Sequence, residues 1–154
     1  MMGRQNPSFI VLMADDDEDD CLFVESAFQE MDIAHDLHFV GDGRELLDYL
    51  YNNGDFADPE KYPKPNLILL DLHMPRVDGL EALAIIKSDS QLKNIPVLIL
   101  TTSREEQDIA LAEQAGASSF LTKPGVFEDL TDMLEKFCTA IQHNPNVPFE
   151  VIGC

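Results

Sequence analysis

The sequence predicts an open α/β fold in which a parallel sheet of five strands carries helices on both faces. Two observations lead to this prediction. Continuous apolar runs such as FIVLMA and LILLDL alternate with segments whose apolar residues recur at helical spacing. The alternation repeats five times within 154 residues, a length typical of a single domain.

The five strands are expected where short apolar runs are bounded by polar or turn-forming residues. The runs FIVLMA and LILLDL show no polar alternation, which is typical of strands buried on both faces of a parallel sheet. In chain order the expected strands are Phe9–Ala14, about 36–40, 67–72, 95–103 and 119–124.

Five helices are expected, one after each strand. The first, from Asp19 to about Met31, opens with acids that suit the positive end of the helix dipole. The last, about 126–142, carries five apolar residues along one face: Phe127, Leu130, Leu134, Phe137 and Ile141. The other three are expected at 44–50, 80–89 and 104–117.

The chain divides into an N-terminal lead (1–8), a folded domain (9–142) and a C-terminal tail (143–154). Inside the domain, about 51–65 is a long loop, because glycine and three prolines interrupt any regular pattern. We expect the tail to be irregular or briefly extended. Its apolar residues have no place in a five-stranded unit and are expected to pack on the domain or on a second copy: Val147, Phe149, Val151 and Ile152.

Composition excludes several classes of function. The net charge of -19 repels nucleic acid, so direct DNA or RNA binding is not expected. No run approaches the roughly 20 apolar residues of a membrane span, and no secretory signal is visible. Three cysteines without a CxxC pair fit a reducing, cytoplasmic compartment.

Polar side chains gather where the expected strands end. Asp15 and Asp16 follow the first strand, Asp71 the third, Thr101 the fourth and Lys123 the fifth. In an open parallel sheet these ends meet in one crevice, where ligands bind. The carboxylates suit a hard divalent cation such as Mg²⁺. Asp71 is then placed as a nucleophile toward a phosphoryl group, whose charge Thr101 and Lys123 would help to neutralise.

The ordered set ADDDED, LLDLHMPRVDG, LILTTS and FLTKP resembles the receiver domain of bacterial two-component response regulators, from about Phe9 to Ile141. The resemblance implies a flavodoxin-like fold with strand order 2-1-3-4-5. It implies that Asp71 is the phospho-acceptor and that Asp15 and Asp16 form the acidic pair. Asp16, Asp71 and the backbone carbonyl of His73 would then bind Mg²⁺, with Mn²⁺ as the alternative cation.

The same resemblance implies the remaining roles. Thr101 is the hydroxyl that moves toward the phosphate, and Lys123 is the amine that contacts it. The Lys123–Pro124 bond is expected to be cis. Phe120 occupies the position of the switch aromatic, which rotates inward on activation.

The expected partner is a histidine kinase, and a homodimer is left open. The subgroup that this chain most resembles pairs small regulators with phytochrome-type histidine kinases and also carries a long insert before the third strand. The chain has no room for an output domain after residue 142, so we expect a stand-alone regulator that signals through its partner-binding surface rather than an enzyme.

Each of these residues also has an alternative interpretation. Asp15 and Asp16 could be a helix cap, Lys123 a surface lysine, Thr101 a strand residue chosen for β-propensity and Phe120 a core aromatic. An EF-hand fails because the position that needs glycine is Asp20. A phosphatase of the haloacid dehalogenase type would need a second acid where the chain has His73. A pure interaction module remains the third alternative.

Overall fold

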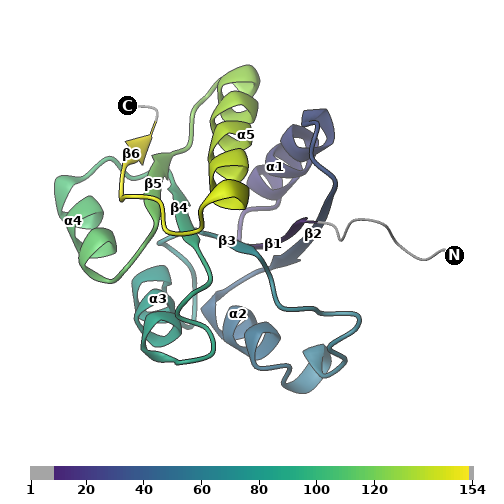
Figure 1. Cartoon of the computed structure of the whole chain (residues 1–154). Coiled ribbons are helices and arrows are strands. Elements are labelled where there is room, and N and C mark those ends of the chain that lie inside the picture. The colour runs from purple at the N-terminus through teal and green to yellow at the C-terminus, as the bar shows by residue number, and fades with distance from the viewer. Residues whose placement is uncertain (1–8, 153–154) are drawn as a thin grey trace, which may run out of the picture.

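The computed structural model describes residues 9–152, which fold as a six-stranded parallel sheet between two layers of helices (Figure 1). The strand order is β2-β1-β3-β4-β5-β6. The strands are β1 (Phe9–Ala14), β2 (His35–Val40), β3 (Leu67–Leu70), β4 (Val97–Thr101), β5 (Ser119–Thr122) and β6 (Val151–Ile152). The predicted lead, 1–8, and Cys154 lie outside the described residues.

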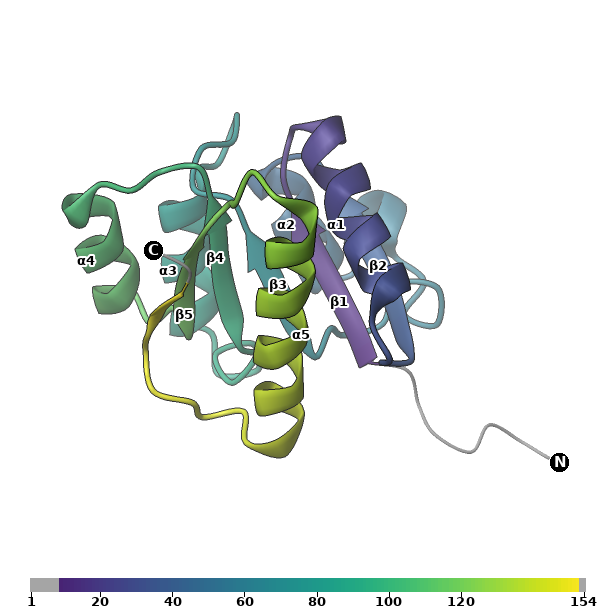
Figure 2. The same ribbon diagram turned by 90° about the horizontal axis from the view of Figure 1, so that it is seen from above.

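The helices alternate with the strands as the sequence predicted. They are α1 (Glu18–Glu30), α2 (Gly43–Leu50), α3 (Gly79–Ser88), α4 (Glu106–Gln114) and α5 (Phe127–His143), with a short 3-10 turn, η1 (Gly54–Phe56), in the long loop. Figure 2 shows α1 and α5 side by side on one face of the sheet, while α2, α3 and α4 lie on the other. Among the described residues, no helix is long and apolar enough to cross a membrane.

The central strands are apolar throughout because both of their faces are covered. All four residues of β3 are fully buried. Leu67 and Leu69 pack into the core under α1 and α5, whereas Ile68 and Leu70 pack into the core under α2, α3 and α4. Strand residues alternate between faces, so one apolar run supplies both cores. Truncating one of these leucines to alanine should cost about 2–5 kcal/mol.

Aspartates begin three of the helices. The carboxylate of Asp17 accepts hydrogen bonds from the amides of Asp19 and Asp20 at the start of α1. Asp42 and Asp78 cap α2 and α3 in the same way. These caps satisfy amides that the first helical turn leaves unpaired. In the acidic run that opens the first helix, Asp17 is the residue that caps it.

The prediction of five strands was incomplete, because the tail adds β6 parallel to β5. Phe120 pairs with Val151, and the Phe120 amide donates to the carbonyl of Glu150 at 3.0 Å. The apolar tail residues drive this return: Phe149 and Val151 pack on one core, Val147 and Ile152 on the other. Of the two expected outcomes for the tail, packing on its own domain is the one observed. An edge strand that would otherwise expose its backbone is thereby covered.

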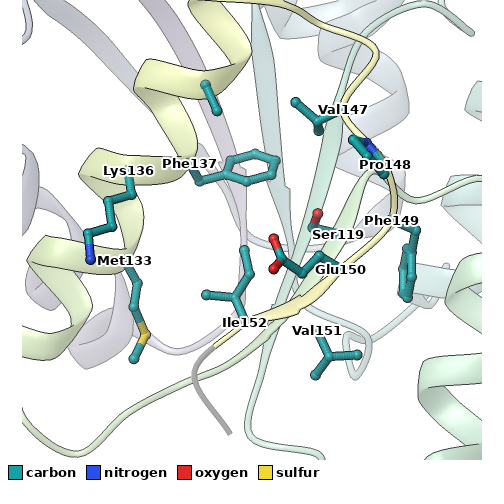
Figure 3. A pocket seen from close by; sticks show the side chains of 11 residues that line it. Ser119, Met133, Lys136, Phe137, Val147, Pro148, Phe149, Glu150, Val151 and Ile152 are labelled. Carbon is teal, nitrogen blue, oxygen red and sulfur yellow. The ribbon is translucent and has the colours of Figure 1, made fainter.

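A cavity of about 730 Å³ remains between α5 and the returning tail (Figure 3). Phe137 points into it from α5, and Val147 and Ile152 line it from the tail. Its polar groups are Ser119, Lys136 and Glu150. None of the acids at the strand ends lines this cavity.

The long loop before β3 is held by specific contacts. The Tyr49 hydroxyl donates to the carbonyl of Pro63 at 2.9 Å, and the Asn52 side-chain amide donates to the carbonyls of Phe56 and Tyr62. Asn52 has a φ of 53°, a left-handed conformation that asparagine tolerates better than most residues. The rings of Tyr49, Phe56 and Tyr62 pack on one another at centroid distances of 5.0–5.6 Å. The loop is thus a fixed part of the α2 side of the domain.

Candidate functional site

The strand register brings four separate parts of the chain to one edge of the sheet. The Asp15 amide donates to the carbonyl of Val40, and the Asp71 amide donates to the carbonyl of Ala14. The Lys123 amide donates to the carbonyl of Thr101 at 2.7 Å. These backbone bonds extend the ladders just past the strand ends. The first residue beyond each strand is therefore held in place at the carboxyl edge of the sheet.

Three carboxylates meet there. Oxygen atoms of Asp15, Asp16 and Asp71 lie within 4.8 Å of one another. Asp15 and Asp71 are buried, with 3% and 8% of their surfaces exposed, whereas Asp16 is exposed. An all-oxygen set that is open on one side fits a hard divalent cation that keeps some of its waters. The acidic cluster therefore has the chemistry of a divalent metal site.

Lys123 supplies the positive charge of the site. Its ammonium lies 2.7 Å from Asp15 Oδ2, 2.6 Å from Asp20 Oδ2 and 3.8 Å from Asp71 Oδ2. Only 12% of the lysine side chain is exposed. One nearly buried ammonium is thus shared among three carboxylates, two of which it contacts at hydrogen-bond distance.

The pKa values of this cluster follow from its burial and its charges. Burial raises the pKa of Asp15 above its usual value, and the nearby charge of Asp71 adds to the effect, while Lys123 opposes it. Burial alone would lower the pKa of Lys123, but its hydrogen bonds to Asp15 and Asp20 outweigh burial, so that this pKa is raised. The two shifts have different causes, because burial dominates for Asp15 whereas the surrounding carboxylates dominate for Lys123. Lys123 therefore stays charged at neutral pH.

Comparison with known proteins agrees with this geometry. Residues 11–135 match the response regulator receiver domain family. The chain belongs to this family.

Its relatives include regulators from phytochrome signalling. The response regulator Rcp1 of Synechocystis sp. is 36% identical over 135 residues, which cover 88% of this chain and 90% of that protein. The Mn²⁺-bound structure of Rcp1 superposes with a TM-score of 0.78 at 34% identity, covering 92% and 99% of the two chains. The phosphorylated cyanobacterial phytochrome response regulator RcpA gives 0.78 at 33% identity, covering 85% and 91%.

Within residues 9–152, two residues expected at this receiver site make no hydrogen bond to its carboxylates. Thr101 is fully buried, and its hydroxyl accepts a weak bond of 3.4 Å from the amide of Ser103. Phe120 is also fully buried and packs in the core on the α2, α3 and α4 side. The structure thus brings together Asp15, Asp16, Asp71 and Lys123, while the switch roles of Thr101 and Phe120 stay predictions.

The expected cis bond was wrong. Among residues 9–152 there is no cis peptide bond, so Lys123–Pro124 is trans. Trans is the intrinsically preferred isomer before proline, by about 0.5–1 kcal/mol. The Lys123 ammonium reaches the acids of the receiver site with this trans bond in place.

The segment after Asp71 packs closely against the strand that precedes it. A side chain at Gly79 would meet the carbonyl oxygen of Asp71 at 2.3 Å, so only glycine fits there. The His73 amide lies 3.5 Å from Asp71 Oδ1, at the limit of a hydrogen bond. This places the His73 backbone beside the Asp71 carboxylate, and the role of its carbonyl as a metal ligand stays a prediction. The His73 side chain is largely exposed.

Sequence reasoning missed one member of the cluster. The sequence predicts only a favourable dipole interaction for the acids that open the first helix, but the Asp20 carboxylate also contacts Lys123. A signal was present: Asp20 lies four residues before Val24, on the same side of α1 as the buried residues Val24 and Phe28. An acid on the inward face of a helix needs a partner, and Lys123 is that partner.

Proposed function

We propose that Asp71 accepts a phosphoryl group from the phosphohistidine of a partner histidine kinase. The observation that best supports this proposal is that the Asp71 carboxylate lies among Asp15, Asp16 and Lys123 at the strand ends of a receiver fold. In the transfer, an oxygen of Asp71 forms a bond to phosphorus while the bond from phosphorus to the histidine nitrogen breaks. The leaving imidazole takes a proton from solvent, and Asp71 becomes an acyl phosphate.

The residues around Asp71 have separable parts in this proposal. Asp15, Asp16 and Asp71, with the carbonyl of His73, would hold Mg²⁺, which supplies positive charge to the phosphoryl oxygens when bound. Lys123 places a second positive charge beside Asp71. Thr101, at the end of the neighbouring strand, is the hydroxyl that would turn toward the loaded phosphate.

The kinase partner is proposed to be phytochrome-type, because Rcp1 and RcpA are similar to this chain along most of their length and RcpA is a phytochrome response regulator.

We place the receiver unit at 9–142 and its action in the cytoplasm, where free thiols such as Cys21 and Cys138 stay reduced. Output would pass through a surface that changes on phosphorylation, in a complex with a partner or a second copy. We assign the chain no substrate turnover of its own.

The test is the intact mass of the full chain after incubation with acetyl phosphate, with Mg²⁺ or with a chelator. We expect a gain of one phosphoryl group that needs the cation. Asp71→Asn should not gain it, whereas Asp58→Asn, an exposed acid in the long loop, should behave as wild type.

Two results would contradict the proposal. One is a phosphoryl group on the Asp71→Asn chain at the wild-type rate. The other is repeated hydrolysis of a simple phosphate ester, many cycles per chain, which would indicate a phosphatase.

A further inference from the structure

The ammonium of Lys123 is nearer to a helix residue than to the proposed acceptor. Asp20 Oδ2 of α1 lies 2.6 Å away, and Asp71 Oδ2 lies 3.8 Å away. Asp15 Oδ2 takes a second contact at 2.7 Å. Two of the three ammonium hydrogens are therefore directed at Asp15 and Asp20. Asp71 receives the charge of Lys123 without a hydrogen bond.

The surroundings of the pair strengthen the contact between Asp20 and Lys123. The two side chains border a small cavity of about 80 Å³ between α1 and the start of α5. The rest of its lining is apolar: Phe23, Val24, Leu100, Pro124 and Leu130. Little water screens the charges on this side, so the attraction is larger than for a pair on the open surface. The cavity also leaves the lysine stem room to change its conformation.

A phosphoryl group on Asp71 would compete with Asp20 for this ammonium. Its oxygens carry more negative charge than the carboxylate and extend further from the strand end. To contact them, Lys123 has to give up part of its bonding to Asp15 or Asp20. Among residues 9–152, Lys123 is the one cation that contacts the fully buried side chain of Asp15, whereas Asp20 is 30% exposed and can be rehydrated. Asp20 is therefore the partner that costs less to release.

We propose that Asp20 is a positioning residue that holds Lys123 back from Asp71 and so limits how readily Asp71 is phosphorylated. This inference rests on the proposed function of Asp71. In the unphosphorylated chain Lys123 is bonded to α1 through Asp20. In the phosphorylated chain this bond is exchanged for one to the phosphoryl oxygens, which frees the first turns of α1 from β5.

The experiment compares Asp20→Asn with Asp19→Asn in the full chain. Asp19 is exposed, lies one residue earlier on the same turn and has no side-chain contact with Lys123 among the described residues, so its substitution removes the same charge. With acetyl phosphate and Mg²⁺, we expect Asp20→Asn to gain the phosphoryl group about fivefold faster than wild type. Asp19→Asn should stay within about twofold of wild type. Asp20→Glu, which keeps the charge, should fall between wild type and Asp20→Asn.

A second comparison separates positioning from a general effect of charge or stability. In a Lys123→Met background, Asp20→Asn should alter the phosphorylation rate no more than Asp19→Asn does, because the ammonium that Asp20 holds is gone. Thermal unfolding of each variant checks that it is folded.

Each outcome has a distinct meaning. Equal rates for Asp20→Asn and Asp19→Asn, or the same acceleration in the Lys123→Met background, would overturn this inference and leave the acceptor role of Asp71 intact. A wild-type chain that gains no phosphoryl group would overturn both.

Discussion

The guanidinium of Arg76 donates two hydrogen bonds to the carboxylate of Asp42, at 2.8 and 3.2 Å. Arg76 does so from a backbone φ of 67°, which is uncommon for a residue with a long side chain. Asp42 is also the cap of α2. The pair therefore joins the segment after β3 to the start of α2. The two segments also touch at the next residues, because a side chain at Gly43 would meet the carbonyl oxygen of Val77 at 2.0 Å.

We expect Asp42→Asn to weaken this junction in a pH-dependent way. Burial acts to raise the pKa of Asp42, but hydrogen bonds from Arg76 and from the Glu45 amide outweigh it and lower the pKa below its usual value. A group with a lowered pKa in the folded state adds stability above its unfolded pKa, about 3.9, and loses it as pH falls through the folded value. Wild type should thus be more stable than Asp42→Asn at pH 7, and the difference should shrink as pH falls below about 4 and vanish only below the folded-state pKa of Asp42.

Urea unfolding of the two chains between pH 3 and 7 measures this difference. Asp48→Asn is the control, because its partner Arg44 is exposed and the pair is a simple contact along the helix. A difference that is the same at every pH would contradict the argument. Asp42→Ala should cost about 1 kcal/mol more than Asp42→Asn, since it also removes the helix cap.

Removing the Lys123 ammonium should leave the strand-end acids without a counter-charge. The Asp15 side chain is fully buried, and breaking a buried pair by deleting one partner costs about 3 kcal/mol. We expect Lys123→Met to lower the free energy of unfolding by about this amount without divalent cations. Mg²⁺ or Mn²⁺ should then raise the melting temperature of the variant more than that of wild type, because the cation replaces the lost charge.

Calorimetry with and without the cation checks this prediction, and Lys93→Met, on the exposed loop before β4, is the control. An equal rise of the melting temperature in both chains would show that Lys123 and the cation do not compete for the same carboxylates.

The strands, helices and strand-end acids could be predicted from the sequence because each has a local signal. The residues of β3, LILL, are all apolar because both faces of this strand are buried. Helix α5 has one apolar face because only that face packs on the core. The position of Asp71 then follows from topology, since parallel strands end at one edge.

What escaped prediction depends on contacts between distant residues. β6 has only two residues and follows a proline-containing segment, so the sequence shows no alternation of apolar residues that would indicate a strand. It forms because β5 has an open edge with which it can pair. Asp20 looks like any other acid of a first helical turn, and only the fold brings it to Lys123, 103 residues away. The isomer of the Lys123–Pro124 bond likewise has no signal in the residues themselves.

Deleting residues 147–154 should destabilise the domain and expose the edge of β5. Four apolar side chains lose their contacts with the two cores, at about 3 kcal/mol in total. The melting temperature should fall by roughly 10 °C. The amide of Phe120, which loses its bond to the Glu150 carbonyl, should exchange with solvent faster.

The control for the deletion is a chain that lacks only residues 153–154, which keeps every described contact of β6. Unchanged melting of the longer deletion would mean that the return of the tail contributes nothing to the stability of the domain.

Ser103 is expected to fix the start of α4. Its hydroxyl donates to Asp108 Oδ2 at 2.6 Å and accepts from the Glu105 amide at 3.2 Å, while the capping residue Glu105 makes no side-chain cap bond itself. Ala112 is the one buried residue of α4, so this helix has little packing to replace a lost cap. Ser103→Ala should cost about 1 kcal/mol locally and speed amide exchange across Glu106–Gln114 about fivefold. Hydrogen exchange measured by mass spectrometry tests this, with the exposed Ser26→Ala on α1 as control.

Faster exchange spread evenly over all helices would indicate global destabilisation, whereas a change confined to α4 would establish Ser103 as the contact that holds this helix beside the strand ends.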